Sequence, residues 1–182
     1  YEAYYNGAIK LGDLERNSRR SLMEQGWGHL NLGILNFRLS KIEPARDRFT
    51  SSINIFETVL RKFGMDPSVQ YELANCHSWL ADSYYVANEI EESLRHRLTS
   101  ADLKYIIWQA DTTNRSAQYD YLIEKRAIAL HHEKLDQIKM ALDGLGKVSI
   151  ESSILANSDR ANQVWRKLVI NVQADLKRLR KG

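Results

Sequence analysis

Two adjacent histidines followed by a glutamate, His131-His132-Glu133, come nearest to a metal-binding cluster in this sequence. On a helix, neighbouring side chains point about 100° apart, so these cannot share one tetrahedral ion without a further ligand. The single cysteine, Cys76, rules out a local cysteine cage, and the His-Glu-x-x-His pattern of zinc proteases does not occur. We therefore expect a structural or surface role for these residues and predict no bound metal.

Cys76 precedes His77, and a thiol beside an imidazole suggests a nucleophile with its base. Adjacent residues on a helix face different directions, so this pair is poorly placed for proton transfer. Free cysteine is commonly a small buried side chain. We expect Cys76 to be a core residue.

The segment Gly144-Leu145-Gly146-Lys147 has the glycines and lysine of a phosphate-binding loop, but it lacks the preceding strand and the full Walker spacing. We expect the two glycines to kink or end a helix instead. The carboxylates Glu89, Glu91 and Glu92 lie among polar residues at a link between helices, where a solvated face or a helix start explains them. Since nothing assembles a nucleophile, a base and an oxyanion site, we predict that the chain is not an enzyme and binds no cofactor.

The balance of charge gives little attraction to nucleic acids or anionic membranes, because 26 basic and 23 acidic residues leave a net charge of only +3 in 182 residues. The one local excess, 177–181, is typical of a solvated helix end. No apolar run approaches the length of a membrane span. A lone cysteine fits a reducing compartment, so the expected location is cytoplasmic.

The chain resembles itself at an offset of 48 residues, and periods between about 20 and 50 residues are typical of stacked helical units. Gln70-Tyr71-Glu72 aligns with Gln118-Tyr119-Asp120, and Leu80-Ala81 aligns with Ile128-Ala129. In the other direction His77 aligns with His29, and the same shift pairs Leu80 with Leu32, Ala81 with Gly33, Ser93 with Ala45 and Ser100 with Ser52. Three units therefore share one pattern.

Apolar residues within each unit recur at steps of three and four residues, as in Phe49, Ile53 and Phe56, which predicts helices and no strands. Short breaks at 40–44, 87–89 and about 132–134 make consecutive helices antiparallel neighbours. Small residues face each other in these hairpins and allow close approach. We expect Gly33, Ala81 and Ala129 on the first helices to lie opposite Ala45, Ser93 and Ala141 on the second.

One helical repeat domain over 1–182 is expected, with units at about 17–65, 66–112 and 113–157, a partial unit at 1–16 and a final helix at 158–181. Lys10-Leu11-Gly12 is similar to Lys62-Phe63-Gly64, where a helix is expected to stop at a glycine cap. The chain thus begins part way through a repeat, in the partial unit at 1–16, which indicates that the segment was cut from a longer polypeptide.

These residues resemble the tetratricopeptide repeat family, and Leu32-Gly33, Ala45, Phe49 and Ser52 make the best match. The second unit offers Leu80-Ala81, Tyr84 and Ser93 but has Arg97 in place of Phe49, and the third offers Ile128-Ala129, Ala141 and Leu145. The units are longer than the family's 34 residues, and its tryptophan site holds His29, His77 and Lys125. The resemblance implies an all-α, right-handed superhelix of antiparallel hairpins.

The long form of the repeat, with Asp66-Pro67-Ser68 at a helix entry, looks like arrays appended to bacterial signalling proteins. In that setting the resemblance implies a scaffold or regulatory module beside a kinase, nucleotide-binding or DNA-binding domain. The partner is then a protein or peptide segment. Self-association, through unit ends or the helix of Trp165, and small-ligand sensing are the alternatives.

The first helices of such an array line a concave face, which is the expected binding site. Leu30 and Ile34 stand where lysine and asparagine would grip a C-terminal carboxylate, so chaperone-tail binding is disfavoured. Trp27 and Trp79 could each contact a partner or be buried between adjacent repeats, because large aromatic residues are common in both settings. The predicted partner-binding side chains are Trp27, Asn31, Arg38, Asn75, Trp79, Asp82, Arg126 and Lys134.

Overall fold

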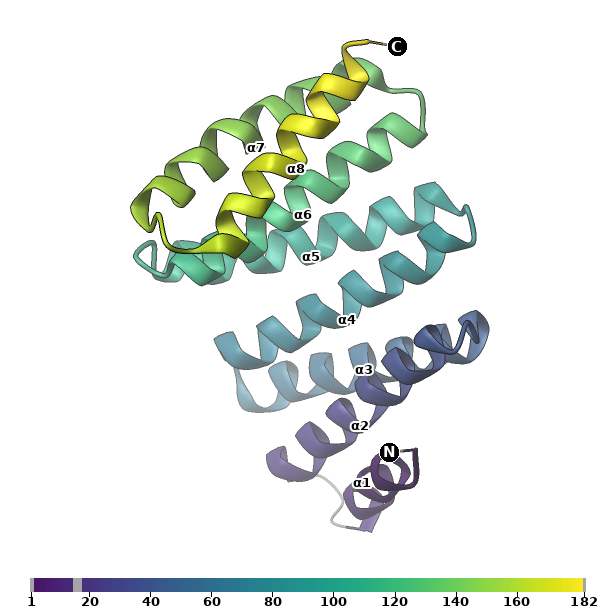
Figure 1. Ribbon diagram of the computed structural model, residues 1–182. Helices are drawn as coiled ribbons and strands as arrows, with labels where there is room; N and C mark the ends of the chain where they lie inside the picture. The colour runs from purple at the N-terminus through teal and green to yellow at the C-terminus, as the bar shows by residue number, and fades with distance from the viewer. Residues whose placement is uncertain (1, 15–17, 182) are drawn as a thin grey trace. The chain divides into compact units, whose positions relative to one another are not determined.

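The computed structural model describes residues 2–14 and 18–181, and all secondary structure in those ranges is helical. The described ranges contain eight helices, which Figure 1 labels, and consecutive helices run antiparallel. Their bounds are α1 Glu2–Leu14, α2 Arg19–Arg38, α3 Ile42–Phe63, α4 Pro67–Val86, α5 Ile90–Ala110, α6 Arg115–Lys134, α7 Ile138–Ser158 and α8 Gln163–Leu179. The all-α prediction is confirmed.

The chain divides into two compact units, 1–103 and 104–182, and the boundary falls inside α5. These two units are larger than the 48-residue repeats, and "first unit" and "second unit" refer to them from here on. In the first unit α1 packs on α2, α2 on α3 and α3 on α4, around a core that includes Phe49, Phe56 and Val69. In the second unit α6 packs on α7 and α7 on α8, around Leu122 and Leu145 among others. The single domain, its expected unit limits and the hand of the superhelix stay predictions.

The first helices, α2, α4, α6 and α8, begin at side-chain caps spaced by 48 residues. Ser18, Asp66, Asn114 and Asn162 each accept a hydrogen bond from a backbone N–H in the first turn, such as that from Ala117 to Asn114 at 3.0 Å. Such a cap satisfies a donor that a helix start leaves unpaired and contributes about 1 kcal/mol. Four different sequences thus start a helix at the same point of the repeat.

The turns between the helices of each hairpin repeat at the same interval. Ser40, Asn88 and Asp136 have positive φ angles of 58°, 63° and 59°. Asparagine and aspartate tolerate the left-handed region better than most residues do, and Ser40 adopts the same conformation at the equivalent turn. Each is followed two residues later by the isoleucine that begins a second helix. A strict 48-residue repeat of caps and turns makes the chain a helical repeat protein.

Two of the expected breaks lie elsewhere. The third, expected at about 132–134, lies at 135–137, because α6 continues to Lys134 and Asp136 makes the turn. The first is shorter than 40–44, because Pro44 lies in the first turn of α3, where its missing N–H costs no helix bond.

Glycines end helices less often than the sequence indicated. Gly64, with φ of 89°, does follow the end of α3, as expected. The helix α1 continues through Gly12 to Leu14, so the helix end expected there was wrong. The helix α7 continues through Gly144 and Gly146, so of the two alternatives for these glycines the helix end is wrong and the kink stays a prediction. Gly144 instead accommodates Ala129, since a Cβ built on it would lie 3.1 Å from the Ala129 Cβ.

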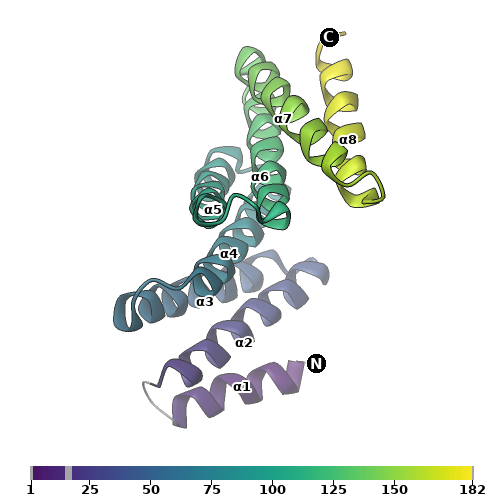
Figure 2. The ribbon, with the colours of Figure 1, turned by 90° about the vertical axis from the view of Figure 1, so that its left-hand side faces the viewer.

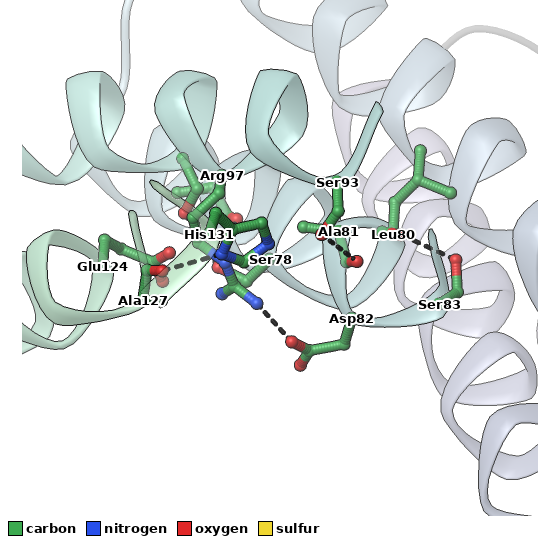
Figure 3. Close-up of polar contacts among 12 residues, drawn as sticks. Ser78, Leu80, Ala81, Asp82, Ser83, Ser93, Arg97, Glu124, Ala127 and His131 are labelled. Atoms are coloured by element: carbon green, nitrogen blue, oxygen red, sulfur yellow. Dashed lines mark hydrogen bonds and ion pairs between the residues drawn. The ribbon is translucent and has the colours of Figure 1, made fainter. Parts of the chain in front are cut away.

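Gly33, Ala81 and Ala129 are buried at equivalent positions of the first helices, and of the three expected facing pairs the contact of Ala81 with Ser93 is confirmed. The pairs of Gly33 with Ala45 and of Ala129 with Ala141 stay predictions. A Cβ on Gly33 would lie 2.5 Å from the ring of Phe49, so the glycine makes room for that ring. At the next equivalent position the Ser93 hydroxyl donates to the carbonyl of Ala81 at 2.6 Å (Figure 3). Ala129 faces Gly144 in the third hairpin. We call this position of a first helix, held by Gly33, Ala81 and Ala129, the seam position.

Candidate partner-binding face

The predicted partner-binding residues of the first unit lie on two first helices that contact each other, α2 and α4. On α2, Trp27, Asn31 and Arg38 recur at helical spacing on one face, and Trp27 is 36% exposed. Arg38 is exposed, and the half-buried Asn31 donates its amide to the Trp27 carbonyl at 2.9 Å. An aromatic ring, an amide and a guanidinium thus lie on one helix face.

On α4 the predicted side chains take part in packing within the unit. The Trp79 indole meets the rings of Phe37 and Phe49 at centroid distances of 5.8 and 6.3 Å and belongs to the edge of the core. The packing explanation for this tryptophan therefore holds, and a role in binding stays a prediction for its half-buried edge. Asn75 is half-buried on the same face.

Asp82 forms an ion pair with Arg97 of α5, as Figure 3 shows. Arg97 is only 6% exposed and occupies the repeat position of Phe49 and Leu145, which are fully buried. A buried guanidinium is costly unless it is paired. Asp82 therefore serves the structure of the first unit, and this explains the charged residue that interrupts the repeat pattern.

In the second unit, Arg126 of α6 pairs with Asp175 of α8 at 2.8 Å, and Lys134 is exposed at the end of α6. Arg178 adds an ion pair to Glu133, which lowers the pKa of that carboxyl below its usual value. Arg126 thus fastens α8 to α6. Its contact with a partner stays a prediction.

A buried ion pair that the sequence did not predict lies in the second unit. The Lys104 ammonium of α5 donates to the Glu124 carboxylate of α6 at 2.6 Å, and the two residues are 7% and 1% exposed. The equivalent positions 48 residues earlier hold Phe56 and Cys76, both fully buried. Aligning Lys104 and Glu124 with the apolar residues of the preceding repeat would have predicted from the sequence that both lie in the core.

The histidines at equivalent positions make equivalent contacts between helices. His29 Nδ1 lies 3.4 Å from Arg48, and 48 residues on His77 Nδ1 lies 3.0 Å from His96 Nδ1. The His96 ring also stacks on Tyr84 with a centroid distance of 5.6 Å. His29 and His77 thus have the same role, which is packing against the second helix of their hairpins.

The pKa of both His77 and His96 is lowered to about 4, mainly by burial. The charge of His96 also lowers the pKa of His77, and the nearby Arg95 guanidinium contributes to both shifts. The hydrogen bond between them needs one ring to accept, which two imidazolium rings cannot do. The unfolded chain binds protons near pH 6.5, so it takes up more protons than the folded chain between pH 6.5 and about 4. Stability supplied by this pair is complete above that window and is lost as pH falls through it.

We expect urea unfolding to show a fall in the free energy of unfolding of a few kcal/mol between pH 6.5 and 4. The double variant His77→Gln, His96→Gln should flatten this part of the profile. The single variant His132→Gln changes a histidine outside the pair and should retain the slope. An equal slope in the double variant and the parent would contradict the assignment.

The other residues that the sequence singled out for possible chemistry make structural contacts. The Cys76 thiol is buried beside the Ser52 hydroxyl at 3.1 Å, and burial raises its pKa to about 12, which suits a core residue. His131, His132 and Glu133 contact Ala127, Gln137 and Arg178 respectively, so the three point to different neighbours.

In the part of the chain that the structure describes, no group of three or more histidine, cysteine, aspartate or glutamate side chains is placed to hold a metal ion. No helix among the described residues is long and apolar enough to cross a membrane.

The repeated caps, turns and seams define the class: a helical repeat protein built of antiparallel hairpins. The de novo designed helical repeat protein DHR64, in its crystal structure, is similar to this chain at 12% sequence identity and a TM-score of 0.42, over 99% of this chain and 94% of that one. No protein-family model matches the sequence. No curated protein matches it at a significant level.

Proposed function

We propose that this chain is a tetratricopeptide-like module that binds a protein or peptide segment as a scaffold or regulator within a larger bacterial signalling protein. The observation that supports the proposal is the α2 face, where Trp27, Asn31 and Arg38 offer a partly exposed ring, an amide and a guanidinium. Aromatic and arginine side chains supply most binding energy at protein interfaces, while polar groups fix the register of the ligand. The adjacent α4 face extends the same surface with Asn75 and the edge of Trp79.

Two of the charged residues predicted to bind a partner have structural roles instead. Asp82 and Arg126, both predicted to bind a partner, are engaged in ion pairs within their own units. This narrows the proposed contact residues to Trp27, Asn31 and Arg38 on α2, with Asn75, the edge of Trp79 and Lys134 as further candidates. A ligand that carries an apolar side chain and, about 16 Å away along α2, a carboxylate matches Trp27 and Arg38.

A peptide library displayed on phage, selected on the purified chain, tests the proposal. Selected peptides should lose about tenfold or more in affinity when Trp27→Ala or Arg38→Glu is introduced, because a truncated interface anchor commonly costs more than 1 kcal/mol. Phe63→Ala and Arg61→Glu are matched controls, since both residues are exposed on α3 of the same unit. Peptides that bind all four variants and the parent alike would overturn the proposed site.

A further inference from the structure

One face of α7 carries a stripe of exposed side chains at helical spacing. Helix α7 packs on α6 and α8, the two helices beside it in Figure 2, through a buried face that includes Leu145 and Val148. At about 100° per residue, the side chains that follow position 140 at steps of three and four lie on the opposite side of the helix. We call them the α7 stripe, which consists of Met140, Asp143, Lys147, Ile150 and Ile154.

The internal repeat shows that this surface stays open where further helices follow. On α3, against which the next helix α4 packs, the positions equivalent to 143 and 150 hold Asp47 and Asn54, and both are exposed. On α5 the same positions hold Arg95 and Asp102, which are exposed as well. The exposure of the α7 stripe therefore follows from its place on the outer side of a second helix.

The α7 stripe is apolar at both of its ends. Met140, Ile150 and Ile154 are 53%, 66% and 62% exposed. On α3 the positions equivalent to the two isoleucines hold the polar residues Asn54 and Thr58. Exposed apolar side chains on one helix face, where the equivalent face of another repeat is polar, indicate an interaction surface.

The charges in the middle of the stripe indicate what covers it. Asp143 and Lys147 lie one turn apart and form an ion pair at 2.8 Å, with Met140 before them and Ile150 after them. When a second copy of α7 lies antiparallel on the first, each Asp143 meets the Lys147 of the other copy, and each Met140 meets the other copy's Ile150. The stripe is therefore complementary to itself, as the interface of a twofold-symmetric dimer must be.

Other arrangements of two copies bring like charges together. Parallel helices in register place Asp143 on Asp143 and Lys147 on Lys147. An antiparallel pair centred on Lys147 places two ammonium groups in contact. Like charges at facing positions suppress the wrong arrangement, and a polar residue within an apolar helix seam fixes its register at some cost in stability. The central charges thus select one antiparallel register.

We propose that the chain forms a twofold-symmetric dimer in which two copies of α7 pack antiparallel through the α7 stripe. Met140 and Ile150 make apolar contacts on either side of a central group of Asp143 and Lys147 side chains from both copies. Ile154 extends the contact towards the start of α7 in the second copy. The stripe shares no residue with the α2 face, so this proposal and the proposed function hold or fail independently.

Sedimentation equilibrium of the chain at about 5 to 500 μM tests the dimer. We expect a monomer–dimer equilibrium with a Kd of about 10–100 μM, which leaves the chain monomeric at the ~1 μM suited to unfolding experiments. Ile150→Asp should weaken the dimer about tenfold or more, because the symmetry removes the apolar contact twice. Ile170→Asp is the matched control, since Ile170 is 64% exposed on α8 of the same unit, and it should leave the Kd unchanged.

Exchange of the central charges tests the register. Asp143→Lys gives a chain with lysine at both central positions, and Lys147→Asp gives one with aspartate at both, so each variant should pair with itself at least tenfold more weakly than the parent. Mixed in equal amounts, the two variants should form a heterodimer, because every lysine then faces an aspartate. Circular dichroism checks that each variant keeps its helices, as expected for exposed positions.

Four results contradict the proposed interface. The first is a parent chain that stays monomeric at about 500 μM. The second is a dimer that Ile150→Asp leaves intact, and the third is one that Ile170→Asp dissociates, which would assign self-association to α8. The last is a mixture of the two charge variants that pairs no better than each variant does alone.

Discussion

Replacing Lys104 with methionine alone is expected to lower the free energy of unfolding by about 3–5 kcal/mol. The change leaves the Glu124 carboxylate, 1% exposed, without the ammonium that lies 2.6 Å away. A buried charge deprived of its partner costs far more than the pair contributed. Urea unfolding at pH 7, monitored by circular dichroism, measures the loss.

The double variant Lys104→Met, Glu124→Leu should recover most of that loss, because two apolar side chains replace both charges. The equivalent Phe56 and Cys76 show that the repeat accepts apolar residues at both positions. Lys147→Met is the matched control, since Lys147 and Asp143 are paired at 2.8 Å but 62% and 65% exposed, and its effect on stability should be small beside that of Lys104→Met. A double variant as unstable as the single one would show that the pair is not a replaceable core contact.

Gly33→Ala is expected to destabilise the first unit by about 1–3 kcal/mol, although glycine to alanine inside a helix normally stabilises by about 1 kcal/mol. The added methyl group would lie 2.5 Å from the ring of Phe49. That ring is fully buried, so it has no free space into which to move. Thermal or urea unfolding gives the sign directly.

Two other glycines within helices provide controls for the expected change of sign, from the usual stabilisation by alanine to destabilisation at Gly33. Gly7 of α1 and Gly146 of α7 have no neighbouring atom within 4 Å of an added Cβ. Gly7→Ala and Gly146→Ala should therefore be neutral or stabilising by up to about 1 kcal/mol. If Gly33→Ala stabilised to the same extent as these, Gly33 would not be the contact that lets α2 approach α3.

The partner-binding residues show where the sequence argument stops. Spacing at three and four residues put Asp82 and Arg126 on the expected face, but their partners Arg97 and Asp175 lie on other helices. Trp79 could not be assigned from sequence to interface or core, and it packs on Phe37 and Phe49. Periodicity predicts the helix face on which a residue lies, but it does not predict which residues of another helix will contact that face.

Local signals by themselves determined the all-helical class, the hairpins and the 48-residue repeat, because helix periodicity, caps and turns act within a few residues. Ser18, Asp66, Asn114 and Asn162 carry that information in the sequence. Only the tertiary structure decided that Lys104 and Glu124 form a buried pair and that Gly33 makes room for the ring of Phe49. Burial and pairing depend on neighbours distant in the chain, and a residue's own type does not specify them.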